Sequence, residues 1–460
     1  MTGSTKLLEI RLVRESPDTV KASLRHRGMP EKIEEVDRLV SLDSQWRRGL
    51  AEVESLRKRR NEITKRIAEA RKKSEDTNRL MTEAEAIPGQ IKNLGEEVEQ
   101  YKRQAEEILL NLPNLVHETV PVGKDEADNV EVKKWGEIPR FQTRPLDHID
   151  LGLKHSLIDV EKAGQVAGAR FYYLRDDLVR LNYALVQYGL DFIRQKGFRL
   201  LQPPYLLHRD IVAGAVALAD FQDVIYKIEG EDLYLIATSE HALLAFHSDE
   251  ILDGQTLPLR YSGISPNFRK EAGAHGRDTK GIFRVHQFEK VEQFVYSLPD
   301  ESWSLHEELL RNLEEFWQSL KIPYRVVNVC TGDLGTVPAK KYDLEAWLPG
   351  QGKYREMASC SNCTSYQAVR SKIRYREKPS EPTKYPHTLN STLVATERAL
   401  VAILENFQRP DRTIEIPRVL TKYMDGQETM PASEKMKPQQ DPTRWIPSPS
   451  AATELEKHKH

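Results

Sequence analysis

The chain has 460 residues, of which 39% are hydrophobic and 30% charged, and its formal net charge is −2. This length allows two or three domains with a sizeable core, and the balanced charge excludes a global basic field that attracts nucleic acid. No apolar run approaches the about 18 residues of a membrane-spanning helix, and the acidic start lacks a targeting pattern, so we expect a cytoplasmic protein with no membrane partner.

Residues 31–112 differ from the rest of the chain because apolar residues recur at three- and four-residue steps. The repeat comprises Leu39, Leu42, Trp46, Leu50, Val53, Leu56, Ile63 and Ile67, then Ile91, Leu94, Val98, Tyr101, Ala105, Ile108 and Leu112. This spacing predicts a long antiparallel α-helical coiled coil, an arm of about 60 Å. The turn is expected at residues 74–78, and Pro88-Gly89 is expected to kink or restart the second helix.

The first helix of this arm has a strongly basic stretch from Arg57 to Lys73, in which nine cations face two acidic residues, a local balance of +7. A charge run alone is more often a solvated helix face, but Arg60 falls where an apolar seam residue is expected. A basic stripe on a projecting arm suits a phosphate backbone. The residues expected to contact it are Arg57, Lys58, Arg60, Lys65, Arg66 and Arg71.

Residues 113–170 are a connector rich in Pro, Gly and Asp, after which short helices alternate with strands rich in Val, Ile, Tyr and Phe. Without a βαβ rhythm or a GxGxxG pattern, this order predicts an α+β domain in which helices flank an antiparallel β-sheet. The polar, proline-containing end of the chain predicts a disordered tail. The expected domains are the arm-bearing unit 1–113, the α+β domain 114–425 and the tail 426–460.

Two stretches carry side chains suited to one reaction. The first is Asn267–Glu271, a ten-residue loop and Ile282–Glu292; the second is His387–Leu393, leading to Arg398. In the strand after the loop, alternation places Arg284, His286, Phe288, Lys290 and Glu292 on one face, and Phe283, Val285, Val291 and Val295 on the other. An ordinary solvated hairpin is the alternative, but an aromatic ring among charges fits stacking on a base better. The glycine-rich, basic loop 272–281 is predicted to close over a ligand.

The three arginines in these stretches suit a polyphosphate. Attack of a carboxylate on an α-phosphate brings two anions together, so fixed cations must neutralise the developing charge. Arginine binds phosphate oxygens at two points through its planar fork. Arg269, Arg284 and Arg398 are therefore the candidate catalytic residues, and the pattern indicates nucleotide-dependent activation of a small amino acid.

These stretches resemble the seryl-tRNA synthetases of the standard type, which are class II aminoacyl-tRNA synthetases, over about residues 1–425. The matching segments are Phe268–Glu271 with Phe283–Phe288 (motif 2), Thr388–Arg398 (motif 3), Gly197–Pro204 (the dimer-forming motif 1) and Arg355–Cys363 (beside ATP). The resemblance implies a homodimer whose catalytic domain, 114–425, activates L-serine with ATP. The seryl group then passes to tRNA(Ser). The arm would bind the long variable region of this tRNA.

The resemblance also implies roles for single residues. Arg269 would bridge the α-phosphate and the serine carboxylate, while Arg284 and Arg398 hold the far end of the triphosphate. The rest of the ATP site would be Lys270, Glu271, Val285, His286, Gln287, Phe288, Glu356, Met357, Ala358 and Ser359, with Glu356 and Ser359 also holding Mg²⁺. The rest of the serine site would be Thr238, Ser239, Glu240, Glu292, Asn390 and Thr392. For Thr238 a helix cap is the alternative, and the division of hydroxyl recognition between Asn390 and Thr392 stays open.

Zinc is not expected. Cys360 and Cys363 form a CxxC, but a structural zinc site needs about four ligands, and neither a second CxxC nor a nearby histidine pair is present. A rarer form of this family holds the substrate amine on zinc, whereas this chain resembles the metal-free form in its Thr238–Glu240 loop and its N-terminal helical hairpin. Three rival functions remain: a class II enzyme for another amino acid, a non-catalytic paralogue acting as a binding or scaffold protein, and a coiled-coil interaction protein. The complete motif set disfavours the second, and the third does not explain the second half of the chain.

Overall fold

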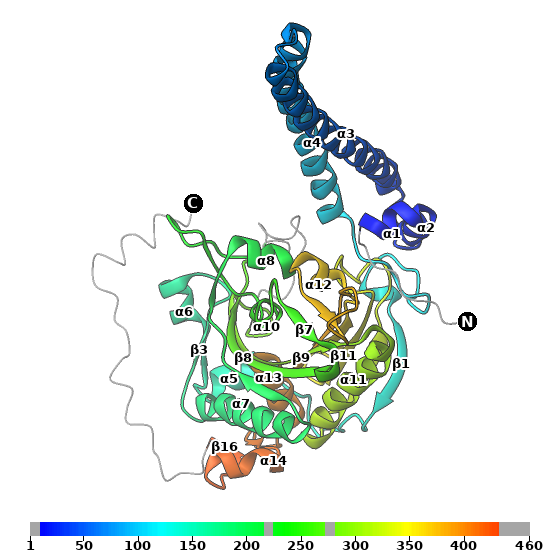
Figure 1. The fold of residues 1–460 in the computed structure, drawn as a ribbon. Coiled ribbons are helices and arrows are strands. Elements are labelled where there is room, and N and C mark those ends of the chain that lie inside the picture. Colours follow the sequence, from blue (N-terminus) through cyan, green and yellow to red (C-terminus); the bar gives the residue numbers. More distant parts are fainter. Residues whose placement is uncertain (1–9, 216–223, 272–280, 432–460) are drawn as a thin grey trace, which may run out of the picture.

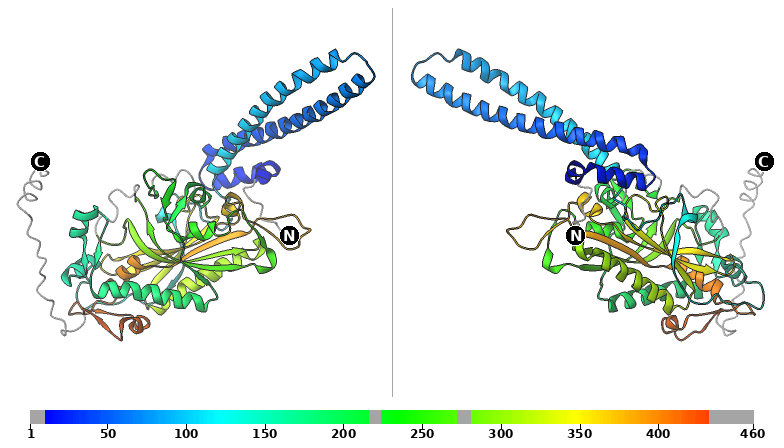
Figure 2. Two further views of the ribbon diagram at one scale, coloured as in Figure 1. Left: turned by 60° about the vertical axis from the view of Figure 1, so that its left-hand side comes forward. Right: turned by 90° about the vertical axis from the view of Figure 1, so that its right-hand side faces the viewer.

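The computed structural model describes residues 10–215, 224–271 and 281–431. A helical arm projects from a body built around one large sheet, and the two views in Figure 2 show the paired helices side by side along the arm. The arm consists of α3 (Ile33–Lys72) and α4 (Asn78–Asn111), so the predicted turn is confirmed. Among the described residues, no helix is both long and apolar enough to cross a membrane.

The seam of the arm buries Val53 and Ile63 of α3 and Val98 of α4, as the apolar repeat predicts. Ile87 of α4, which lies outside that repeat, is buried as well. Gly49, rather than the predicted Leu50, is buried in the seam, where an added Cβ would lie 2.6 Å from Val98 Cγ2. Leu50 is 39% exposed. Of the two outcomes expected at Pro88-Gly89, a restart does not occur, since α4 runs unbroken through Pro88. Seam packing on both sides of Pro88 outweighs the one backbone hydrogen bond that proline removes.

The base of the arm is a small core of its own. Here α1 (Ile10–Glu15) and α2 (Pro17–His26) pack against the start of α3, and Leu112 and Tyr366 complete the cluster. The Tyr366 hydroxyl donates to the Leu112 carbonyl at 2.8 Å. This core joins the arm to the body, so the arm is anchored at one end and free along the rest of its length.

The body is an eight-stranded sheet in the order β1-β10-β11-β12-β14-β9-β8-β4. The strands are β1 (Val130–Trp135), β10 (Tyr324–Asn328), β11 (Lys340–Leu348), β12 (Lys353–Asn362), β14 (His387–Ala395), β9 (Gln287–Ser297), β8 (Leu259–Phe268) and β4 (Arg199–Leu201). Every neighbouring pair is antiparallel except β4 and β8. The predicted α+β class is confirmed, with one parallel pair at the edge.

Helices cover both faces of this sheet (Figure 1). On one face α7 (Asp177–Gln195), α11 (Ser302–Ser319) and α13 (Thr396–Asn406) bury the main core, which includes Val291 and Val295 of β9. On the other face α8 (Arg209–Ala215), α10 (Ser239–Ala245) and α12 (Tyr366–Arg370) lie over Phe294 and Tyr296. Alternation along β9 therefore places its polar residues Lys290 and Glu292 on the face that also carries α10.

Two segments expected to lack regular structure contain elements. The connector holds β1, α5 (His148–Lys154), β2 (Ile158–Asp159) and α6 (Val160–Ala167), with β2 paired to β3 (Tyr173–Leu174). The start of the predicted tail at residue 426 is wrong by a few residues, because β16 (Thr429–Met430) pairs with β15 (Ile414–Glu415) and buries Met430. Residues 432–460 lie outside the described residues, as does loop 272–280.

The remaining short elements complete the body. They are β5 (Leu206–His208) with β6 (Leu233–Leu235), β7 (Ile251–Asp253) with β13 (Arg374–Arg376), and α14 (Arg418–Thr421).

Candidate active site

One open pocket of about 870 Å³ gathers most of the predicted side chains. It lies where the end of β8, the start of β9, the middle of β12 and β14 and the start of α13 meet. The lining residues are Thr238, Glu240, Arg269, Glu271, Phe283, Arg284, Val285, Phe288, Lys290, Glu292, Glu356, Met357, Ala358, Ser359, Asn390, Thr392, Ala395, Glu397 and Arg398. Of the residues expected to bind ATP or serine, all line it except Ser239, Lys270, His286 and Gln287.

These four residues occupy other positions. Ser239 is buried against β8, where its hydroxyl lies 2.7 Å from the point that a Cβ on Gly263 would occupy. His286 braces the backbone, since its Nδ1 lies 2.7 Å from the Arg269 carbonyl oxygen. Lys270 donates its backbone N–H to the Val224 carbonyl at 2.9 Å, and Gln287 is exposed at the start of β9.

We expected Phe283 and Val285 to lie on the strand face opposite the polar residues, and this prediction is wrong. The strand begins only at Gln287, so residues 283–286 do not alternate as a strand does. Phe283 and Val285 are buried and also line the pocket.

Four lining residues were absent from the expected site: Phe283, Lys290, Ala395 and Glu397. Lys290 had a usable signal, because it lies between Phe288 and Glu292 on the same strand face. For Glu397 the only sequence signal was its place beside Arg398. Its Oε2 is buried without a hydrogen-bond partner among the described residues. Burial raises the pKa of Glu397 to about 8, although Arg398 opposes the shift.

Three arginines enter the pocket from separate segments. Arg398 donates to the Glu356 carbonyl at 3.0 Å and lies 3.4 Å from its carboxylate. Arg284 donates to Glu271 at 2.8 Å. Arg269 donates to the Ala237 carbonyl at 3.2 Å, and its guanidinium carbon lies 5.2 Å from the centre of the Phe288 ring. Converging cations of this kind form a ready anion site.

The arginines and carboxylates shift each other's pKa values. Burial lowers the pKa of Arg269, and Arg398 lowers it further. Burial would also lower the pKa of Arg398, but Glu356 and Glu397 outweigh it, so the net shift is upward. Burial would raise the pKa of Glu356, but Arg398 and Lys341 keep it below the ordinary value. Glu356 is therefore an ionised carboxylate at neutral pH.

A β-bulge in β12 explains why Glu356 and Ser359 reach the same pocket. Residues three apart in a regular strand point to opposite faces. Opposite β11, however, Leu344 pairs with Ala358 while the next residue, Glu345, pairs with Glu356. Met357 is thus an extra residue that brings Glu356 and Ser359 to one side, a use of bulges that is common beside active sites.

The other end of the pocket is lined with the carboxylates Glu240 and Glu292. Lys290 donates to the Thr238 hydroxyl at 2.7 Å and pairs with Glu292, which accepts from the Thr392 hydroxyl at 3.2 Å. Thr238 also caps α10, as the alternative for this residue predicts.

Glu240 stands beside this group and accepts from Asn390 Nδ2 at 3.1 Å and from Gln367 at 2.6 Å. Burial, with Glu292 nearby, raises the pKa of Glu240 to about 7. Two carboxylates and two hydroxyls in this space suit an ammonium group beside a hydroxyl-bearing side chain.

Cys360 and Cys363 are free and buried behind the pocket. Cys363 Sγ lies 3.5 Å from Asn390 Nδ2, and burial raises the pKa of both thiols. Thiolates, not thiols, are the ligands that zinc prefers. Across the described ranges, no group of three or more His, Cys, Asp or Glu side chains is arranged to hold a metal ion.

On the arm, all six residues expected to contact phosphates are exposed: Arg57, Lys58, Arg60, Lys65, Arg66 and Arg71. Arg60 is exposed rather than buried in the seam, where Ile63 packs instead. The neighbouring Arg59 pairs with Glu83 of α4.

Two known domain families match the chain. The seryl-tRNA synthetase N-terminal domain model matches residues 7–116, and the class II core domain model (G, H, P, S and T) matches residues 224–407. The serine–tRNA ligase of Nitrosopumilus maritimus is 51% identical over 92% of this chain and 99% of its own length.

Solved structures give the same result. Seryl-tRNA synthetase from Pyrococcus horikoshii complexed with ATP has a TM-score of 0.88 and 50% identity, covering 93% of this chain and 100% of that one. The cytoplasmic enzyme of Naegleria fowleri in complex with AMP has a TM-score of 0.84 and 37% identity, covering 93% and 99% of the two chains. The chain therefore belongs to the seryl-tRNA synthetases, class II enzymes that activate serine with ATP and transfer it to tRNA.

Proposed function

We propose that the pocket binds ATP at its arginine-lined end and serine at its carboxylate-lined end, and that Arg269 joins the two. The observation that carries this proposal is the convergence of Arg269, Arg284 and Arg398 on one cavity that also contains Glu240 and Glu292. Arg269 neutralises the serine carboxylate and the α-phosphate as they approach. Arg284 and Arg398 hold the far phosphates, Phe288 stacks on the adenine, and Glu271 accepts from its amino group.

The serine end recognises an ammonium and a hydroxyl. Glu240 and Glu292 accept from the ammonium together with the Thr238 hydroxyl, while Asn390 and Thr392 approach the serine hydroxyl. A site that pairs with a substrate hydroxyl rejects an analogue lacking it by about 10⁴–10⁵-fold. Alanine is excluded in this way, because it leaves the buried polar groups unpaired.

Exchange of labelled pyrophosphate into ATP, run with a panel of amino acids, tests this assignment. We expect exchange with serine, at least about 10⁴-fold slower exchange with alanine, and weak exchange with threonine, which shape must exclude. Fast exchange with an amino acid other than serine would overturn the serine pocket.

We further propose that Mg²⁺ enters with ATP and is held by Glu356 and Ser359. The donor set fits, because Glu356 is ionised and the bulge turns both oxygen-bearing side chains toward the cavity. Mg²⁺ is commonly bound by one or two protein carboxylates and by substrate phosphates rather than by an all-protein cage. When bound, the ion would neutralise phosphate charge beside Arg398. Glu356→Gln should therefore raise the Mg²⁺ concentration needed for half-maximal exchange.

For tRNA, we propose that the exposed basic stripe of α3 binds the phosphate backbone of the tRNA(Ser) variable region. We also propose that the chain forms a homodimer in which the arm of one subunit serves the pocket of its partner. Heterodimers combining one subunit without the distal arm and one carrying Arg269→Ala test this. Each such dimer has one intact arm and one intact pocket, on different subunits. Charging by these heterodimers supports service in trans, and its absence supports service in cis. The proposed location is the cytoplasm, where charged tRNA is consumed.

A further inference from the structure

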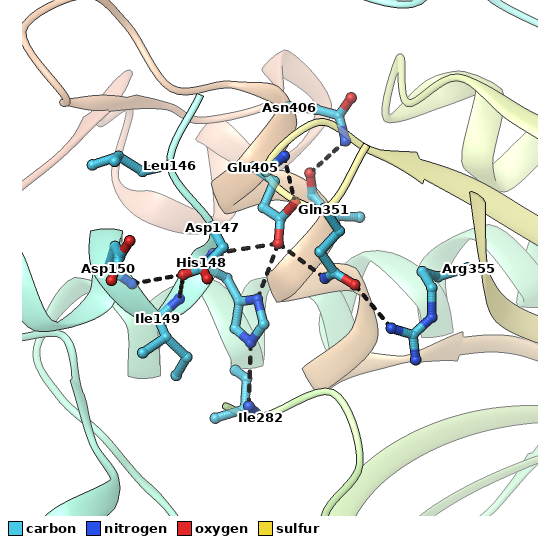
Figure 3. Close-up of polar contacts among 12 residues, drawn as sticks. Leu146, Asp147, His148, Ile149, Asp150, Ile282, Gln351, Arg355, Glu405 and Asn406 are labelled. Atoms are coloured by element: carbon cyan, nitrogen blue, oxygen red, sulfur yellow. Dashed lines mark hydrogen bonds and ion pairs between the residues drawn. The ribbon is translucent and has the colours of Figure 1, made fainter. Parts of the chain in front are cut away.

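A buried carboxylate accepts hydrogen bonds from N–H donors of two other segments of the chain (Figure 3). Glu405, near the end of α13, is fully buried. Its Oε1 accepts from the His148 backbone N–H at 3.3 Å, from His148 Nδ1 at 3.0 Å and from Gln351 Nε2 at 3.2 Å. Its Oε2 accepts from the Gly350 backbone N–H at 3.0 Å. Glu405 thus ties α13, the start of α5 and the β11–β12 turn together.

The donors around Glu405 fix the protonation of His148. Backbone N–H groups and the Gln351 amide NH₂ face Glu405, so its oxygens act only as acceptors and His148 Nδ1 carries the proton. Gln351 is oriented by its other end, since its Oε1 accepts from Arg355 Nη1 at 2.8 Å. The Ile282 backbone N–H donates to His148 Nε2 at 3.4 Å, so this nitrogen is the acceptor and carries no proton. An imidazole that donates at one nitrogen and accepts at the other fits this place.

The contact with residues 281–282 is close and specific. Gly281 has φ +90°, and a Cβ added there would lie 2.2 Å from His148 Nε2. Only glycine allows the backbone to approach the imidazole in this conformation. The backbone that enters the pocket at Phe283 and Arg284 is therefore set directly against His148.

Both branches of this network end at Phe283. One runs from Glu405 through His148 to Ile282, the residue before Phe283. The other runs through Gln351 to Arg355, whose guanidinium carbon lies 4.0 Å from the centre of the Phe283 ring. Arg398 lies over the same ring at 5.2 Å. Because Arg398 precedes Glu405 by seven residues on α13, about two helical turns, the helix that presents Arg398 also carries the anchor for Ile282.

We propose that His148 is a positioning residue for ATP, which holds the Ile282–Arg284 backbone at a fixed distance from Arg398 through its neutral, Nδ1-protonated imidazole. The proposal rests on the proposed function of the pocket, in which Arg284 and Arg398 hold one triphosphate. Burying a carboxylate among neutral N–H groups costs free energy that an apolar side chain would not. The directional bonds of Glu405 therefore serve geometry better than stability, and phosphate binding depends on the relative placement of the two arginines.

Two substitutions of His148 test the roles of its two ring nitrogens separately. In His148→Gln, the side-chain amide reaches the position of Nε2 and restores the acceptor for Ile282. In His148→Asn, the amide occupies the position of Nδ1, keeps the bond to Glu405 and leaves the Ile282 N–H unpaired. An unpaired buried donor corresponds to a loss of about 5- to 100-fold in affinity. We expect His148→Asn to raise the KM for ATP in pyrophosphate exchange by that factor, with the KM for serine changed less than about twofold.

His148→Gln should stay within about threefold of the wild type in the KM for ATP. His155→Gln is the matched control, because His155 Nε2 contacts the Arg412 carbonyl at 2.7 Å away from the pocket. Equal effects of the two His148 variants, or parallel losses for ATP and serine, would refute the positioning role. If the wild type itself showed no serine-dependent exchange, the proposed function would fail instead, before any variant is compared.

A second variant keeps the inference testable if His148→Asn does not fold. Gln351 is half-buried in the β11–β12 turn, so Gln351→Leu disturbs the core less. It removes the donor to Glu405 and the acceptor for Arg355, and we expect a higher KM for ATP with the KM for serine preserved. An unchanged KM for ATP in Gln351→Leu would contradict the proposal.

Discussion

The cations on the arm and the cations in the pocket differ in their exposure to solvent. Arg57, Arg60 and Lys65 are exposed along α3, whereas Arg269 and Arg398 lie in the pocket among buried carboxylates and rings. Exposed charges attract a phosphate backbone without fixing its geometry, and salt screens them. Pocket charges are held by hydrogen bonds, so each one acts at a defined position and contributes more per group. The two regions should therefore respond differently to substitution, pH and salt.

The largest effect should come from removing the distal arm. Replacing residues 52–93 with a short Gly-Ser turn keeps the basal core, including Leu39 and Leu112, which anchors the arm to the body. We expect pyrophosphate exchange to stay within about threefold of the wild type, while charging of tRNA is abolished because the basic stripe is gone. A matching loss of both activities would show that the arm supports the fold of the body.

Arg269→Ala should give the next largest effect. Loss of one preorganised charge-stabilising group costs about 10²–10³ in rate, and we expect pyrophosphate exchange to fall by that factor. Arg260→Ala is the control, since Arg260 lies on the same strand, β8, and pairs with Glu308 away from the pocket. Near-normal exchange by Arg269→Ala would remove this residue from the mechanism.

A change of pH should have a smaller effect, on the KM for serine, because it protonates the buried carboxylate of Glu240. The pKa of Glu240 is raised to about 7, so lowering the pH from 8 to 6 protonates it and removes a negative partner of the serine ammonium. We expect the KM for serine to be about tenfold higher at pH 6 than at pH 8. Glu240→Gln should flatten this dependence while raising the KM at pH 8. A KM for serine that is unchanged between these pH values in the wild type would exclude Glu240 as the titrating group.

The smallest effect should come from single residues of the arm. Lys65→Ala should raise the KM for tRNA a few-fold and reduce the slope of log affinity against log salt by about 0.9. Lys92→Ala, an exposed lysine on α4, serves as the control. Equal effects of the two variants would show that charge anywhere on the arm suffices.

How far the sequence predicts the structure also differs between the two regions. The arm follows from local periodicity, because its partners are close in sequence and its seam repeats every three or four residues. Its departures from the prediction are local too: Gly49 rather than Leu50 is buried in the seam, and α4 continues through Pro88 without a restart. β1 was missed because it lies exposed at the sheet edge along nearly its whole length and therefore lacks a buried apolar face.

The pocket depends on contacts between distant segments, so residue patterns alone reach it only in part. Motif resemblance identifies most lining residues, but it does not show the bulge at Met357, the inward position of Phe283 or the buried Glu397. The His148–Glu405 pair joins residues 257 positions apart. No periodicity predicts such a pair, because only the packed fold brings the connector onto the end of α13.

A crystal structure with a non-hydrolysable seryl-adenylate analogue tests the central claim most directly. We expect the adenine against Phe288, the phosphate-like group within hydrogen-bond distance of Arg269, and the amino group between Glu240 and Glu292. An analogue bound outside this pocket, or bound within it with its amino group toward Arg398, would contradict the account.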